Sequence, residues 1–253
     1  CYLTVRDAMR LVKQPNRPIG LIEDDWGGTP VQAWSTPEAL KSCGLSTVDC
    51  PTEPQSSPTP IVHGGKCTFY PSALYNHMLS PLVGYGLRAV LWMQGEANSN
   101  EGFPLTRSEY ACAFGTMIDA WRKAWDAPSL PFLYVQISSW FGNWGFDKLP
   151  CTYDYCPVIS RIRLAQSDVL HSGRVNVGMA MSYDNGDDQA HGVHSRYKSE
   201  PSRRLAYDLA RLAFNSTVDA RAPEVQGAIV VISRKGRSVK VGVPLINAKG
   251  LTL

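Results

Sequence analysis

Three short motifs contain the residue types that an acyl-transfer reaction needs. They are "WGGT" at 26–29, "QGEAN" at 94–98 and "HGVHSRYK" at 191–198. A backbone amide at a Gly-Gly turn and an asparagine side chain can donate hydrogen bonds to the oxyanion of a tetrahedral intermediate. A histidine can serve as the general base, and a buried carboxylate can hold that histidine in the required tautomer. The three motifs together predict a site for acyl transfer.

Each role in such a site has a candidate residue. Gly27, Gly28 and Asn98 are the candidate oxyanion donors. His194 is the candidate base, and Glu96 is the candidate acid that orients it. Two neighbours in the same motifs are candidate substrate contacts: Gln94 and Trp26. No metal or organic cofactor is predicted.

Each motif also has a structural explanation when it is taken alone. Glu96 fits a solvated acid after a strand, and Asn98 fits ordinary turn chemistry. "WGGT" fits a tight turn with close packing, in which the tryptophan belongs to the core. The order of the three motifs along the chain favours the catalytic interpretation over these separate ones.

Two other chemistries apply to the third motif. His191 and His194 are three residues apart and permit a metal site with the aspartates nearby. Ser195 and Lys198 fit the Ser-x-x-Lys pattern of some acyl-transferring hydrolases. Both patterns are short, and the sequence favours neither over a histidine base.

The elements that must position these residues alternate between strand and helix. The predicted strands are 18–23, 89–93, 131–139 and 175–181, and the predicted helices lie around 35–43, 71–83, 108–125, 159–170 and after Pro201. The alternation predicts an α/β fold in three layers, a parallel sheet with helices on both faces. In such sheets ligands bind at the carboxyl ends of the strands, where the three motifs lie.

The pattern changes after Pro223. Two segments of strand composition, 228–233 and 238–243, predict an antiparallel pair, and the final "LTL" predicts the start of another strand. We therefore expect one α/β domain over residues 1–220 and the start of an antiparallel β module over 221–253.

Composition argues against two classes of partner. The chain has 253 residues, a formal net charge of +3 and no long run of lysine or arginine, which argues against nucleic acid. It has no apolar stretch of the length that a membrane span requires. With 44% hydrophobic residues it can bury a full core.

Seven cysteines predict disulfides and an oxidising compartment. The candidates stand in loop segments that need cross-links: Cys43, Cys50 and Cys67 around a Pro/Ser/Thr-rich stretch, and Cys151 and Cys156 at the ends of "CTYDYC". The "NST" at Asn215 is an acceptor motif for N-glycosylation. These features predict a protein of the secretory or lysosomal route.

Four longer blocks occur in order along the chain: "PIGLIEDDWGGTPVQAWS", "LYNHMLSPLVGYGLRAVLWMQGEAN", "FGTMIDAWRKAW" and "VHSRYKSEPSRRLAYDLARLAF". Together they resemble the sialate O-acetylesterase family, SGNH-type esterases that remove acetyl groups from sugars. The resemblance implies an SGNH-hydrolase-like fold and an acetylated sugar as substrate. By it, a glycine of "WGGT" and Asn98 match the oxyanion residues, His194 matches the catalytic histidine, and Glu96 matches the acid of the "QGE" motif. Asp187, in an acidic loop that the family has before its histidine, is the alternative acid.

The sequence departs from the family in two places. The family's nucleophile is a serine in a "GQSN" motif, which is absent here. We expect that serine upstream of Cys1, in an earlier part of the same protein or on a separate chain. Glu23, Asp24 and Asp25 stand before "WGGT", where the family usually has small or neutral residues.

A carboxylate that faces the oxyanion would oppose its negative charge, so the acids at 23–25 bear on activity. The sequence predicts a serine esterase that removes O-acetyl groups from sialic acid or a similar sugar. The alternative is an inactive protein that keeps the SGNH fold as a carbohydrate-binding or structural scaffold.

Overall fold

The computed structural model describes most of the chain, in two units. The described residues are 1–47, 69–99, 103–139, 157–187, 194–218, 224–225, 230–235 and 238–246. The first unit is Cys1–Ser216 and the second is Thr217–Leu253. The candidate residues of all three motifs belong to the first unit.

The first unit is built on a parallel sheet of three described strands, in the order β1-β2-β3. These are β1 (Val90–Trp92), β2 (Phe132–Val135) and β3 (Val177–Ala180), each inside a predicted strand. Trp92 lies opposite Tyr134, and Tyr134 lies opposite Met179. The parallel α/β arrangement predicted from the sequence is confirmed.

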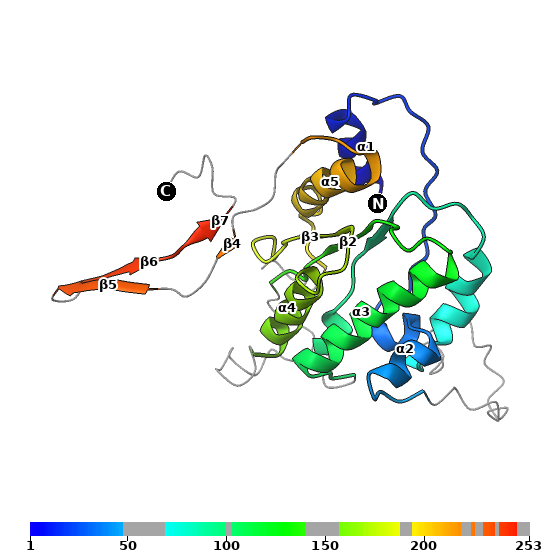
Figure 1. Ribbon diagram of the computed structural model, residues 1–253, viewed down its shortest axis with the longest axis horizontal. Helices are drawn as coiled ribbons and strands as arrows, with labels where there is room; N and C mark the ends of the chain where they lie inside the picture. The colour runs from blue at the N-terminus through cyan, green and yellow to red at the C-terminus, as the bar shows by residue number, and fades with distance from the viewer. Residues whose placement is uncertain are drawn as a thin grey trace. The chain divides into compact units, whose positions relative to one another are not determined.

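Helices cover both faces of this sheet (Figure 1). They are α1 (Tyr2–Leu11), α3 (Arg107–Ala124), α4 (Pro157–Leu170) and α5 (Ser199–Phe214). Side chains alternate along β2: Phe132 and Tyr134 pack into the core that α3 and α4 complete, whereas Leu133 and Val135 pack with α1 and α5. No described helix is long and apolar enough to cross a membrane.

Helix α3 is the clearest sequence prediction and is confirmed. Thr106 and Glu109 form a capping box at its start, which satisfies backbone N–H groups that the helix leaves unpaired. Its predicted apolar face is buried except for half-buried Trp125: Tyr110, Phe114, Met117, Ile118 and Trp121. The long helix therefore supplies Tyr110, Phe114 and Trp121 to the aromatic core on its side of the sheet.

Two predicted elements take another form. The strand predicted at 18–23 is irregular, with Leu21 and Ile22 about half exposed, because no described strand lies beside it to pair with its backbone. The helix predicted at 71–83 is a π-helical turn, η3 (Tyr75–Leu79), followed by a 3-10 turn, η4 (Ser80–Leu82). Pro81 in that segment lacks the N–H that a regular helix would use.

Shorter helical elements also belong to this unit. The helix predicted at 35–43 is α2 (Pro37–Ser42), and Thr36 is its cap because its side chain accepts from the Ala39 N–H. A 3-10 turn, η1 (Val31–Trp34), follows the "WGGT" motif. The first helix, α1, was not predicted.

The second unit contains antiparallel strand pairs. β5 (Val230–Lys235) pairs with β6 (Ser238–Gly242), and β4 (Glu224–Val225) pairs with β7 (Leu245–Ile246). The strand pair predicted in this region is therefore present, while "LTL" lies outside the described residues. That residues 221–253 begin a separate β module stays a prediction.

One disulfide joins α2 to α3. It links Cys43, at the end of α2, to Cys112 in α3 across a sequence separation of 69 residues. The prediction that Cys43 forms a disulfide is confirmed, and its partner Cys112 was not predicted. The remaining candidates lie outside the described residues: Cys50, Cys67, Cys151 and Cys156.

We expect removal of this disulfide to lower the free energy of unfolding by about 4 kcal/mol, the chain-entropy value for a loop of this length. The double variant Cys43→Ala/Cys112→Ala, compared with wild type by chemical denaturation, measures the loss. Cys1→Ser is the matched control, because Cys1 is an exposed free cysteine. Equal stability of the double variant and wild type would contradict the structural role.

Candidate active site

The "QGEAN" motif turns sharply at the carboxyl end of β1. Gly95 has a φ of +149°, and a Cβ atom there would lie 2.8 Å from the Ile137 side chain and 3.1 Å from the Ile162 side chain. A residue with a side chain would therefore push the turn away from the core. The 3-10 turn η5 (Glu96–Ser99) follows directly and carries two of the candidate residues.

Asn98 is fully buried and links three segments of the chain. Its Oδ1 accepts from the Val31 N–H at 2.9 Å and from the Gln94 amide at 2.8 Å. Its Nδ2 donates to Gln32 Oε1 at 2.8 Å and to the Phe103 carbonyl at 3.1 Å. The structure thus brings the segment that follows "WGGT" together with "QGEAN", as the acyl-transfer hypothesis requires.

Gln94 is buried next to Asn98, and its side-chain amide forms hydrogen bonds within the protein. Besides its bond to Asn98, its Nε2 donates to the Thr29 carbonyl at 3.1 Å, and its Oε1 accepts from the Tyr110 hydroxyl at 3.0 Å. Gln166 Nε2 donates to the Gln94 carbonyl at 3.0 Å. The described contacts make Gln94 a support for Asn98, and a contact from Gln94 to substrate stays a prediction.

The "WGGT" motif forms a turn that Thr29 closes. The Thr29 hydroxyl donates to the Trp26 carbonyl at 2.7 Å and accepts from the Trp34 indole at 2.9 Å. Gly28 has a φ of +75°, in the region that favours glycine. Gly27 and Gly28 are exposed, and within the described residues neither backbone N–H donates a hydrogen bond. Both amides are thus available to an external acceptor.

Glu96 and His194 lie within electrostatic reach of each other. Burial raises the pKa of Glu96, while the positive charges of Lys198 and His194 act in the opposite direction on that pKa. His194 itself is exposed. This electrostatic contact is compatible with the predicted acid and base, whose pairing stays a prediction.

Asp187, the alternative acid, is fully buried and bonded to Arg196. The guanidinium donates to both carboxylate oxygens, at 2.7 and 3.1 Å, and the Arg196 backbone N–H donates at 3.2 Å. Arg204 binds Asp184 at 2.6 and 2.7 Å and the Met181 carbonyl at 2.8 Å. The Asp187–Arg196 pair thus joins the segments on either side of residues 188–193, and the Asp184–Arg204 pair ties the first of these segments to α5.

Among the acids at 23–25, only Asp24 is partly buried. Burial raises the pKa of Asp24, and the neighbouring Asp25 raises it further. Glu23 and Asp25 are exposed, so water screens their charge. Asp24 is therefore the one acid of this run that is partly withdrawn from solvent.

The described residues favour neither of the two other chemistries. They hold no group of three or more histidine, cysteine, aspartate or glutamate side chains that could bind a metal, and His191 lies outside them. Ser195 is buried, and its hydroxyl accepts from the Tyr197 N–H at 3.2 Å. The glycosylation candidate Asn215 is exposed at the end of α5.

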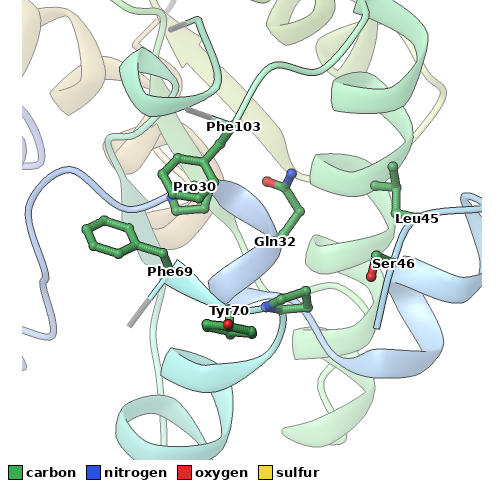
Figure 2. Close-up of a pocket in the computed structure, with 8 residues that line it drawn as sticks. Pro30, Gln32, Leu45, Ser46, Phe69, Tyr70 and Phe103 are labelled. Atoms are coloured by element: carbon green, nitrogen blue, oxygen red, sulfur yellow. The ribbon is translucent and has the colours of Figure 1, made fainter. Parts of the chain in front are cut away.

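A cavity of about 580 Å³ lies beside Gln32 and Phe103 (Figure 2). Its lining is mainly apolar and aromatic: Pro30, Gln32, Leu45, Ser46, Phe69, Tyr70, Pro71 and Phe103. Phe69 and Phe103 stack with ring centroids 5.3 Å apart. Because Gln32 and Phe103 both accept from the Asn98 amide, the cavity wall is in direct contact with the candidate oxyanion donor.

Sequence reasoning missed the residues that support the site. Gln32, Tyr110, Gln166, Arg196 and Arg204 had no assigned role. One signal was present for Gln166, which lies at helical spacing from two apolar residues of α4, Ile162 and Val169. A glutamine on a buried helix face must find hydrogen-bond partners inside the protein, and here it binds the main chain of Gln94.

The parallel sheet with helices on both faces defines an α/β fold, and the candidate acid and amide follow the carboxyl end of its strand β1. A solved structure shares this fold. A carbohydrate acetylesterase from Xanthomonas citri superposes with a TM-score of 0.68 at 24% sequence identity, over 96% of this chain and 46% of the other.

The family assignment is more specific than the fold. The carbohydrate esterase family described as sialic acid-specific acetylesterase matches residues 4–212, and the chain belongs to this family. It is 32% identical over 233 residues to the sialate O-acetylesterases of Pongo abelii and Homo sapiens. The match covers 87% of this chain and 40% of each relative. The chain thus spans less than half the length of these relatives.

The pKa of Glu96 predicts how stability depends on pH. A carboxyl whose folded-state pKa is raised stabilises the fold fully below its unfolded-state pKa, and this contribution is lost as pH rises through the folded-state pKa. As pH rises from 4 to 7, wild type loses this contribution and Glu96→Gln does not. We therefore expect the variant to become more stable relative to wild type over that range, as measured by thermal unfolding at each pH.

Glu109→Gln is the matched control and should behave in the opposite way. Bonds from Thr106 lower the pKa of Glu109, so wild type should gain stability relative to this variant as pH rises. If the stability of Glu96→Gln and of Glu109→Gln relative to wild type changes with pH in the same direction, the raised pKa assigned to Glu96 is wrong.

Proposed function

We propose that this chain provides the base, the acid and the oxyanion donors of a serine esterase that removes O-acetyl groups from sialic acid or a similar sugar. The observation that carries the proposal is the convergence at the carboxyl end of β1. There Glu96 lies near His194, and Asn98 binds the segment that follows the Gly27-Gly28 turn. Membership of a family of sialic acid-specific acetylesterases supports the substrate class.

The nucleophile in this proposal is a serine on an upstream part of the same protein or on a separate chain. β1 is the edge of the described sheet, and a further parallel strand on its free side would end at the same rim as Glu96. Ser195 is a poor substitute because it is buried and accepts a backbone hydrogen bond.

The reaction follows from the positions of these groups. His194 takes the serine proton as the serine oxygen attacks the acetyl carbonyl carbon. The resulting oxyanion accepts from the Gly27 or Gly28 amide and from Asn98. The sugar oxygen leaves with the proton that His194 returns, and the acetyl group stays on the serine. Water, deprotonated by His194, then releases acetate, while Glu96 keeps the imidazole in the required tautomer throughout.

We also propose that the protein follows the secretory or lysosomal route and is glycosylated at Asn215. The Cys43–Cys112 disulfide supports an oxidising compartment. Asn215 is exposed in a left-handed conformation just after α5, and so is accessible to modification. Mass spectrometry of the native protein before and after glycosidase treatment tests the assignment.

A fluorophosphonate probe tests the proposed function on the native protein. We expect it to label a serine upstream of Cys1, identified by mass spectrometry of the labelled peptide. Label on Ser195 would overturn the assigned roles. If a control esterase is labelled and this protein is not, the inactive-scaffold alternative holds.

Replacement of the candidate base gives a second test. We expect His194→Gln to lower kcat for an acetyl ester by about 10²–10⁴-fold, because glutamine cannot accept the serine proton. His77→Gln is the matched control, since His77 is exposed on η3 in another part of the unit, and it should keep wild-type kcat. Equal activity of both variants would remove His194 from the mechanism.

A further inference from the structure

The candidate oxyanion donor is already occupied in this structure. Asn98 has two Nδ2–H bonds, and they donate to Gln32 Oε1 at 2.8 Å and to the Phe103 carbonyl at 3.1 Å. The side chain is fully buried, so no further direction is open to a donor hydrogen. An oxyanion can therefore bind Asn98 only if one of these two acceptors leaves.

Gln32 is the partner that can leave. The Phe103 acceptor is a main-chain carbonyl, whereas Gln32 is a half-buried side chain on the wall of the 580 Å³ cavity. Figure 2 shows its amide projecting into the space that the cavity residues line. Its Nε2 donates to no other described residue, so rotating the amide away breaks one described hydrogen bond.

The rest of the network holds Asn98 still during such an exchange. The Val31 N–H and the Gln94 amide both donate to Asn98 Oδ1, which prevents the Asn98 amide from flipping. Gln94 is fixed in turn by Tyr110 and by the Thr29 carbonyl. The exchange therefore involves the Gln32 side chain alone.

We propose that Gln32 is a positioning residue that occupies the Asn98 donor in the resting site and yields it to the oxyanion. This inference rests on the proposed esterase function. A neutral amide oxygen accepts at least as well as a neutral ester carbonyl, so Gln32 keeps the donor while the substrate is in its ground state. An oxyanion forms a charge-assisted bond roughly twice as strong, and it displaces Gln32.

The consequence is weaker binding of the ground-state ester. Binding energy that is realised only in the transition state raises kcat, whereas energy shared with the ground state lowers KM. Because Gln32 occupies the Asn98 donor, the ester carbonyl forms no hydrogen bond with Asn98 in the ground state.

Gln32→Met tests the proposal in the native protein, because methionine has a similar length and provides no oxygen acceptor. With Asn98 unoccupied, the ester carbonyl takes the donor on binding. We expect KM for an acetyl ester to fall by about 3- to 10-fold, the range of one net hydrogen bond, with kcat within about twofold of wild type. A purely structural role for Gln32 predicts no decrease in KM.

Two further variants complete the design. Tyr70→Phe alters the same cavity at a residue with no described bond to Asn98, and should leave both constants unchanged. Gln32→Asn, too short to reach Asn98, should repeat the decrease in KM and serves if the methionine variant does not fold. An active wild type with unchanged or raised KM in the Gln32 variants would overturn this proposal alone. An inactive wild type would overturn the proposed function as well.

Discussion

The site depends on the buried amide of Asn98. A buried amide that loses a partner costs about 1–3 kcal/mol for each unsatisfied group, so its four hydrogen bonds constrain one another strongly. They fix the distance between the turn at 26–29 and the end of β1, two segments far apart in the sequence. Moving either segment would leave Asn98 or Gln94 without a partner in the core. The geometry of the rim is thereby coupled to the stability of the fold.

The two faces of the sheet contribute different halves of this rim. On the α3 and α4 face, Tyr110 and Gln166 reach the Gln94 side chain and main chain, and so position the amide donors. On the other side, Arg204 at the start of α5 binds the loop after β3, which precedes the segment of His194. Glu96 lies where the two halves meet, next to the donors in sequence and within reach of the base's charge.

The sequence predicts what local periodicity determines and misses what distant pairing determines. Helix α3 and the three strands follow from apolar spacing, and the three motifs mark the rim because strands in a parallel sheet end together. The segment at 18–23 has strand composition, yet a strand exists only with a neighbour to bond, and composition does not provide one. Cys112 and Gln166 carry their roles only because helices far apart in the chain meet in the fold.

In the proposed reaction, the electrostatics of Glu96 connect folding with catalysis. Burial disfavours its ionised form, and the charge of Lys198, together with that of His194 when it is protonated, opposes that effect without removing it. The ionised form of Glu96 is therefore more stable when His194 becomes an imidazolium, because the new positive charge attracts the carboxylate. That charge exists only after the base has taken its proton. A positive charge on the proposed base would then favour the ionised carboxylate, so the burial of Glu96 and its interaction with His194 act in opposite directions.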